Sequence, residues 1–140
     1  MACDRSIVAE VAGLDFLFYV GSAQSFDPRG QKIARAFVAV MRAAGVRIGI
    51  LGAGETSTGE CVRRAGNETL FQSLAKDLIA RLNGLGVTRI VTCDPHAYNT
   101  LKNEYAEFGV ELEVVHHTQL LNRLVREGKL TPVAPTGPKV

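Results

Sequence analysis

The chain alternates short continuous apolar runs with longer stretches in which apolar residues recur at helical spacing. The continuous runs cover residues 14–20, 46–51, 88–92 and 112–116. A run of this length with few polar interruptions is typical of a strand buried on both faces, as in a parallel sheet. The pattern therefore predicts four buried strands.

A helical stripe of apolar residues follows each run, over residues 33–44, 70–85, 98–108 and 120–125. Three of these helices have recognisable starts, in which an Asp or Asn can cap the helix, and in two of them a proline suits the first turn. These starts are Asp27-Pro28, Asn67 and Asp94-Pro95. Glycines that can end helices follow three of the stripes, at Gly45, Gly86 and Gly128.

Fourfold alternation of strand and helix predicts an α/β fold with a parallel sheet, right-handed crossovers and helices on both faces. We expect a flavodoxin-like or Rossmann-like three-layer sandwich with a four-stranded parallel sheet in the order 2-1-3-4. Residues 1–13 are expected to be an N-terminal extension and residues 14–130 a single domain. Residues 131–140 are rich in proline, which predicts a tail or linker.

Composition narrows the possible partners and compartments. The chain has 140 residues, of which 46% are hydrophobic and 21% charged, as expected for one globular domain. A net charge of +2 does not favour nucleic acid or an anionic membrane as the main partner. No apolar run approaches the ~20 residues of a membrane helix, so direct membrane insertion is not expected. Three cysteines at no tight spacing argue against a disulfide framework, and the cytoplasm is the expected compartment.

Candidate binding residues lie where the predicted strands end. In open α/β sheets, ligands bind outside the carboxyl ends of the strands. Polar or ligand-type residues follow all four strands there: Ser22, Ser57, Thr58, Cys61, Cys93, Asp94, His96, His116 and His117. The sequence therefore predicts a site at this rim of the sheet.

Each of these residues also has a structural interpretation. Asp94 suits a helix cap, and Cys93 suits a small buried apolar side chain. His96 suits a surface position in the first helical turn. Arg63 and Arg64 are either a solvated face or a pair that holds an anion. The loop GAGETSTG lacks the Lys-Ser/Thr end of a phosphate-binding loop, so a nucleotide site is weakly supported.

A metal site is an alternative for the same rim. Cys93 and His96 form a Cys-x-x-His pair, and Cys61 with His116 would complete four donors of the kind that zinc prefers. These donors come from separate loops, so their spacing in the sequence alone does not show that they bind a metal.

Four stretches carry a resemblance to one protein family. They read GSAQSFDPRGQKIARAF, GETSTGECVRRAGNETLFQ, DPHAYNTLKNEY and VVHHTQLLNRLVREGKL. Over roughly residues 14–130, the chain resembles the cysteine-rich CCG domain of the heterodisulfide reductase and glycolate oxidase iron–sulfur subunit family, the (Fe–S)-binding oxidoreductases. The resemblance implies an α/β domain of an electron-transfer oxidoreductase.

The resemblance also implies where cluster ligands would lie. Family members hold a 4Fe-4S-type cluster, or zinc, with a cysteine after strand one, Cys-Cys-Gly or a variant after strand two, and Cys-x-x-Cys after strand three. In this chain those positions carry no sulfur: Ser22, Ser57, Thr58, Asp94 and Ala97. Thiolates are the donors that such clusters need, so the ligand set is interpreted as vestigial.

Three hypotheses follow. The leading one is a degenerate CCG domain without its own cluster, which serves substrate-cleft or partner docking beside a second CCG repeat or other iron–sulfur or flavin subunits. Such subunits could hold it peripherally at a membrane. The second is a zinc or iron–sulfur redox domain that uses Cys61, Cys93, His96 and His116. The third is a stand-alone small-molecule or anion-binding module that uses helix N-termini with Arg63 and Arg64.

Overall fold

The computed structural model describes residues 13–133, and its centre is a four-stranded parallel sheet in the order β2-β1-β3-β4. The strands are β1 (Phe16–Tyr19), β2 (Ile48–Gly49), β3 (Arg89–Thr92) and β4 (Glu113–His116). The predicted α/β class, the parallel sheet and the strand order are confirmed. The predicted extension over residues 1–12 and the end of the tail, residues 134–140, lie outside the described residues.

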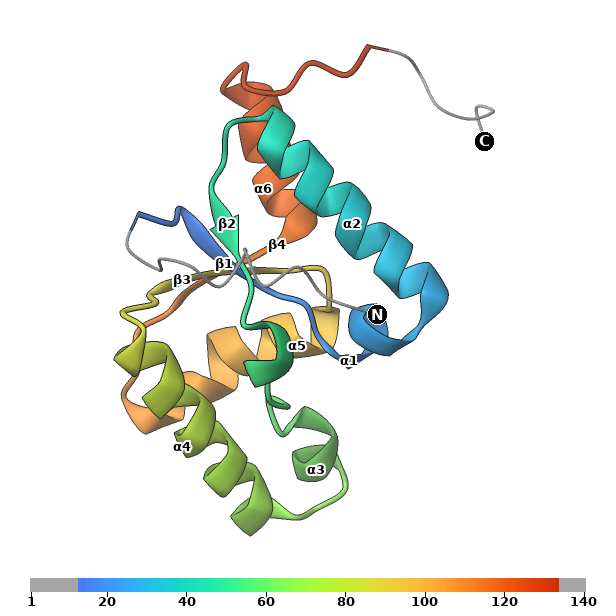
Figure 1. Cartoon of the computed structure of the whole chain (residues 1–140). Helices are drawn as coiled ribbons and strands as arrows, with labels where there is room; N and C mark the ends of the chain where they lie inside the picture. The colour runs from blue at the N-terminus through green and yellow to red at the C-terminus, as the bar shows by residue number, and fades with distance from the viewer. Residues whose placement is uncertain (1–12, 134–140) are drawn as a thin grey trace.

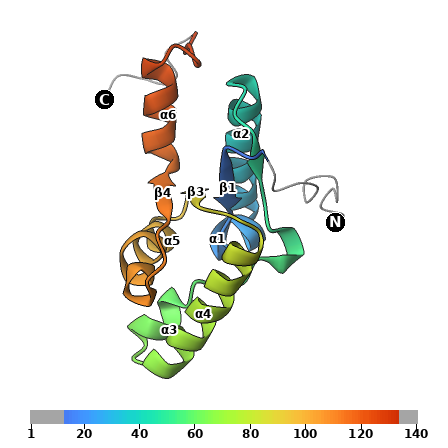
Figure 2. The ribbon, with the colours of Figure 1, turned by 90° about the vertical axis from the view of Figure 1, so that its left-hand side faces the viewer.

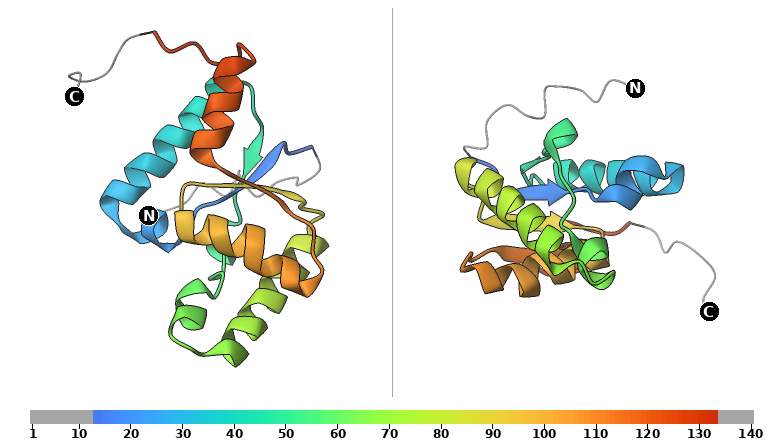
Figure 3. Two further views of the ribbon diagram at one scale, coloured as in Figure 1. Left: turned by 180° about the vertical axis from the view of Figure 1, so that it is seen from behind. Right: turned by 90° about the horizontal axis from the view of Figure 1, so that it is seen from below.

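The helices divide between the two faces of the sheet (Figures 1 and 2). The longer ones are α2 (Pro28–Ala43), α4 (Glu68–Gly84) and α6 (His117–Arg126). Shorter ones are α1 (Ser22–Phe26), α3 (Glu60–Arg64) and α5 (Pro95–Asn99). Figure 3 shows α2 and α6 together on one face, while α4 and α5 cover the other.

Side chains alternate along β1, so this strand contributes core residues to both faces of the sheet. Phe16 and Phe18 pack with Phe37 and Met41 of α2 and with Leu120 and Leu124 of α6. Leu17 and Tyr19 pack on the opposite face with α4 and with the segment that follows β3. All four strand residues are buried, as the continuous apolar run predicts.

The helix starts are confirmed. Asp27, Asn67 and Asp94 each accept a hydrogen bond from a backbone N–H in the first turn of α2, α4 and α5. The expected single helix over residues 98–108 is instead continued from α5 by a π-helical turn η3 (Thr100–Glu104) and a 3-10 turn η4 (Tyr105–Phe108). Leu101 and Tyr105 stay buried against the sheet through this change of pitch.

Strand β2 is much shorter than the apolar pattern predicts, and the helices α1 and α3 and the turn η2 (Gly52–Gly54) were not predicted. Strand β2 has two residues instead of the six expected, because it pairs with β1 only at Ile48 and Gly49. Helices α1 and α3 have five residues each and too few apolar positions to form a stripe. The 3-10 turn η2 (Gly52–Gly54) follows β2. No helix among residues 13–133 is long and apolar enough to cross a bilayer.

Candidate functional site

The loops after β1 and β2 are joined at the rim by one carboxylate. Glu55 accepts hydrogen bonds from the backbone N–H groups of Val20 at 2.9 Å and Gly21 at 2.7 Å. These bonds fix the start of the segment that carries Ser22. The sequence places Glu55 in the glycine-rich loop after the second strand, but it does not show which groups Glu55 contacts.

The loop after β3 meets the loop after β1 through Asp94. One oxygen of Asp94 accepts from the N–H groups of His96 at 2.9 Å and Ala97 at 3.4 Å, which confirms its role as a cap. Its other oxygen faces Gly21, where an added Cβ would stand only 3.0 Å away. Gly21 also has a φ of 82°, so a side chain there would be strained as well as crowded.

Two buried tyrosines hold the loop after β2. The Tyr19 hydroxyl donates to the carbonyl of Thr56 at 2.8 Å, and the Tyr105 hydroxyl donates to the carbonyl of Thr58 at 2.9 Å. Burial raises the pKa of both phenols, so they remain donors at neutral pH. The tyrosines were expected as core residues, and the structure gives them this additional positioning role.

The implied ligand positions therefore lie on three loops that touch one another. Ser22 and Ser57 are exposed, and the Ser57 hydroxyl accepts from the N–H of Gly59 at 3.1 Å. Thr58 is buried, and its hydroxyl accepts from the N–H of Glu60 at 3.4 Å. Ala97 is buried against the core. Hydroxyls, a capping carboxylate and a methyl group do not fit a cluster that needs thiolates.

Cys61 is exposed on α3 beside a carboxylate. Its thiol donates to Glu60 at 3.3 Å, and the other oxygen of Glu60 lies 3.5 Å from Nδ1 of His96. The hydrogen bond and the negative charge of Glu60 raise the pKa of the Cys61 thiol. The protonated thiol is a poor ligand, since metals bind the thiolate.

Cys93 lies within the core on the opposite face of the sheet. It is 6% exposed and belongs to the cluster of apolar side chains under α2 and α6. Burial raises the pKa of its thiol to about 11. The predicted interpretation as a small buried side chain is confirmed, and the structure keeps this sulfur away from Cys61.

The proposed four-donor set is not assembled. Among residues 13–133, no group of three or more His, Cys, Asp or Glu side chains is arranged to hold a metal ion. Binding by Cys61, Cys93, His96 and His116 therefore stays a prediction, and it would require Cys93 to leave its core position.

His116 and His117 lie next to each other at the end of β4, with their ring centroids 4.3 Å apart. The ring of His116 meets Tyr98 edge-on, with centroids 6.0 Å apart, and its Nδ1 lies 2.8 Å from the Thr118 hydroxyl. The His117 ring packs against Phe37 on the other face of the sheet. Burial and the neighbouring His116 lower the pKa of His117.

Arg63 and Arg64 bind carboxylates of this chain. Arg63 pairs with Glu68, Glu104 and Glu107 at 3.0–3.1 Å and lies over the Phe71 ring, 4.4 Å from its centre. Arg64 pairs with Glu104 and lies 3.5 Å from Glu60. Binding of an external anion by these arginines stays a prediction, and such an anion would have to compete with the carboxylates already present.

Glu55 gives a pH-dependent prediction. Burial raises its pKa above the ordinary value of 4.5, although its two N–H donors act in the opposite direction. A raised pKa in the folded state means that this group stabilises the fold most below pH 4.5, and this contribution is lost as the pH rises through the folded-state pKa. We expect the stability advantage of the parent over Glu55→Gln to shrink between about pH 4 and about pH 8, as urea unfolding would measure.

Glu111→Gln, at an exposed carboxylate, is the control for this experiment. Its difference from the parent should be smaller and should not change with the titration of Glu55. A constant offset between the parent and Glu55→Gln at every pH would contradict the assignment.

Comparison with known proteins shows which proteins the chain is similar to. No protein-family model and no solved structure matches the chain. The chain is 51% identical over 121 residues to the probable iron-sulfur-binding oxidoreductase FadF of Bacillus subtilis (strain 168), across 86% of this chain and 17% of the relative. The chain is homologous to a segment of an iron–sulfur-binding oxidoreductase.

Two further redox proteins share the segment. The EtfAB:quinone oxidoreductase of Syntrophomonas wolfei is 43% identical over 126 residues, which are 90% of this chain and 18% of that protein. A probable membrane-anchored ferredoxin of Chromohalobacter salexigens is 39% identical over 137 residues, which are 94% of this chain and 20% of that protein. The chain thus spans no more than a fifth of the length of these relatives.

Proposed function

We propose that the chain is a degenerate CCG domain of an electron-transfer oxidoreductase, which shapes a substrate cleft or docks a partner and holds no cluster of its own. The observation that carries the proposal is the rim itself. Three touching loops bring together the positions at which the resemblance places cluster ligands, and these positions carry Ser22, Ser57, Thr58, Asp94 and Ala97.

The side chains at these positions have structural roles that need no metal. Asp94 caps α5, Ser57 and Thr58 close turns, and Ala97 packs in the core. The rim is also held by Glu55, Tyr19 and Tyr105 without any bound group. Such a preformed surface suits docking, because little ordering is needed when a partner binds.

The size of the relatives supports a partner within the same system. Each relative is about five to six times longer than the matched segment. We therefore propose a second CCG repeat, or another iron–sulfur or flavin subunit, as the partner. The proposed compartment is the cytoplasm, with association at a membrane through such partners, in keeping with the relative named as a membrane-anchored ferredoxin.

A zinc site is the second candidate. One observation favours it, namely that the Glu60 carboxylate contacts both the Cys61 thiol and the His96 ring. Sulfur, carboxylate and imidazole are all zinc ligands. The raised pKa of Cys61 counts against it, because binding would have to remove the thiol proton.

Metal analysis of the anaerobically purified chain separates these functions. We expect iron, sulfide and zinc each below about 0.1 equivalents per chain, since a cluster requires four thiolates. Stoichiometric iron with sulfide would contradict the proposal. Stoichiometric zinc that is lost in Cys61→Ser and His96→Ala would establish the second candidate instead.

A chimera tests the docking part of the proposal. The segment of FadF that matches this chain would be replaced by residues 14–130, and FadF itself would be the control. We expect the chimera to remain a monodisperse, folded protein. Aggregation of the chimera, when the isolated chain is folded, would contradict a docking surface shared with that relative.

A further inference from the structure

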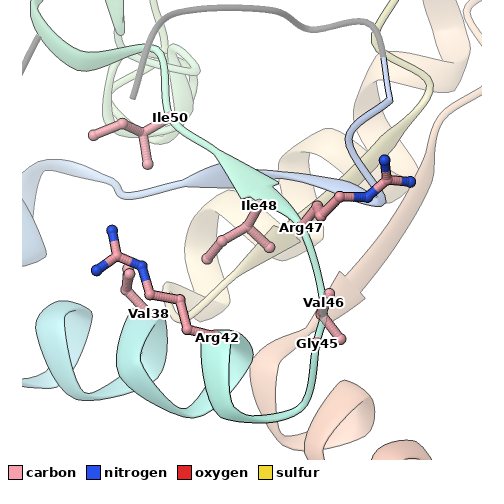
Figure 4. Close-up of a pocket in the computed structure, with 7 residues that line it drawn as sticks. All are labelled: Val38, Arg42, Gly45, Val46, Arg47, Ile48 and Ile50. Atoms are coloured by element: carbon pink, nitrogen blue, oxygen red, sulfur yellow. The ribbon is translucent and has the colours of Figure 1, made fainter. Parts of the chain in front are cut away.

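The groove between α2 and β2 has no nucleophilic side chain in its described lining (Figure 4). It encloses about 390 Å³ and is lined by one glycine, four aliphatic side chains and the arginines Arg42 and Arg47. An arginine side chain stays protonated in proteins and does not act as a nucleophile. Side chains that could be modified covalently therefore lie outside this groove.

The three tyrosines of the chain differ in the surroundings of their hydroxyl groups. Tyr19 and Tyr105 are buried, and each donates its hydroxyl hydrogen to a backbone carbonyl of the loop after β2. Ionisation of either phenol would break this hydrogen bond, because a phenolate has no hydrogen to donate. Tyr98 of α5 differs from both, since its ring is half-buried and its hydroxyl lies at the surface.

The Tyr98 hydroxyl lies next to an ammonium group. Lys102, which follows Tyr98 by four residues, donates from Nζ to the Tyr98 oxygen at 2.7 Å. The same ammonium lies 5.0 Å from the centre of the Tyr98 ring. Lys102 forms no ion pair with a carboxylate within residues 13–133, so no anionic side chain of the described chain competes there for its charge.

These contacts favour the ionised form of Tyr98. The hydrogen bond from Lys102 lowers the pKa of the Tyr98 phenol below its ordinary value of 10.0, although partial burial acts in the opposite direction. A hydrogen bond from the Gln119 amide and the charge of Lys102 lower this pKa further. Burial raises the pKa of the other two phenols, so Tyr98 is the tyrosine that ionises most readily.

We propose that Tyr98 is a site of covalent modification by nitrating electrophiles, which transfer NO₂⁺ to the ring of a phenolate. A ring carbon next to the C–O carbon forms a bond to the nitrogen of the donor's nitro group and loses its hydrogen to the solvent as a proton. The bond that held the nitro group in the donor breaks, and its electron pair leaves with the rest of the donor. The Lys102 ammonium promotes the reaction because it stabilises the phenolate that is attacked. This inference does not depend on the proposed function of the rim.

Nitration would also change a contact between α5 and the end of β4. The Tyr98 ring meets the His116 ring edge-on, with centroids 6.0 Å apart. A nitro group adds bulk and withdraws electrons from the Tyr98 ring. We therefore expect the NMR signals of His116 to shift in the nitrated chain, while the methyl signal of Met41, which is buried under α2, stays in place. Unshifted His116 signals in a chain nitrated at Tyr98 would overturn this part of the proposal.

Tetranitromethane is the probe, because its leaving group is the trinitromethanide anion and the nitrated residue is identified by peptide mass spectrometry. The chain carries Cys3→Ser and Cys61→Ser, since thiols consume the same reagent. We expect Tyr98 to be nitrated at least about tenfold faster than Tyr19 or Tyr105 in the folded chain at about pH 8, because only its phenol has a lowered pKa. Faster nitration of Tyr19 or Tyr105, with circular dichroism unchanged, would overturn the proposal.

Substitution of the lysine tests its role in the reaction. Lys102→Met keeps an unbranched side chain and removes the ammonium, so it should slow nitration of Tyr98 about fivefold. Lys76→Met, at an exposed lysine of α4, is the matched control and should leave the rate unchanged. Equal rates in the parent, Lys102→Met and Lys76→Met would overturn the proposal. An equal loss of rate in both variants would also overturn it, because the effect would then come from net charge and not from the contact with Tyr98.

Discussion

Restoring cysteines at the rim is expected to give the chain an iron–sulfur cluster. The variant carries Ser22→Cys, Ser57→Cys, Asp94→Cys and Ala97→Cys, one thiol at each of four implied ligand positions. The three loops already touch, through Glu55 at Gly21 and through Asp94 beside Gly21. We therefore expect iron and sulfide, after anaerobic reconstitution, to rise from below about 0.1 to roughly four equivalents per chain, with visible charge-transfer absorption.

The matched control removes the sulfur and keeps the other changes. Asp94→Ser with Ala97→Ser leaves serine at all four positions, and serine still caps α5. This control should stay colourless and free of iron. Loss of the Asp94 carboxylate costs about 1 kcal/mol, so circular dichroism must show that the cysteine variant is folded. A folded cysteine variant that takes up no more iron than the control would contradict the assignment of these positions.

Gly59→Ala is expected to be strongly destabilising. Gly59 precedes α3 with a φ of 82°, and an added Cβ would stand 2.9 Å from the Phe71 ring and 3.5 Å from the Phe71 Cα. Backbone strain and overpacking together should lower the free energy of unfolding by about 2–4 kcal/mol, as measured by urea denaturation. The loop that carries Ser57 and Thr58 would be displaced as well.

Gly66→Ala separates the cost of backbone strain from the cost of the contact with Phe71. Gly66 has a similar φ of 87°, but an added Cβ would meet nothing within 4 Å. It should therefore cost only the backbone strain, about 1 kcal/mol. If the two substitutions cost the same, the contact with Phe71 does not determine the position of this loop.

The meeting of the loops could be predicted from the sequence, whereas the contacts of individual side chains could not. Apolar runs fixed the strand ends, so the loops around Ser22, Ser57 and Asp94 were expected to meet. Cys93 follows Thr92 directly, yet its side chain lies in the core under α2 and α6, because neighbouring residues of an extended chain point to opposite faces. The sequence order of Cys93 and His96 suggested a pair of donors that the sheet separates.

Charged residues were the hardest to interpret. Arg63 and Arg64 follow a rim loop, which favoured an anion site. Their carboxylate partners Glu104 and Glu107 lie about forty residues away in sequence. No local sequence pattern predicts these ion-pair partners, because long side chains pair according to which helices meet in space. The role of Glu55 could not be predicted for the same reason, since its N–H donors come from the end of another strand.

The sequence by itself determined the β–α order, the parallel sheet and the caps at Asp27, Asn67 and Asp94. These features depend on local periodicity and on hydrogen bonds within one turn. Only the tertiary structure decided that β2 has two residues, that Cys93 is buried, and that Arg63 forms ion pairs with carboxylates of the same chain. These features depend on contacts between distant segments, whose geometry is set when the helices pack on the sheet.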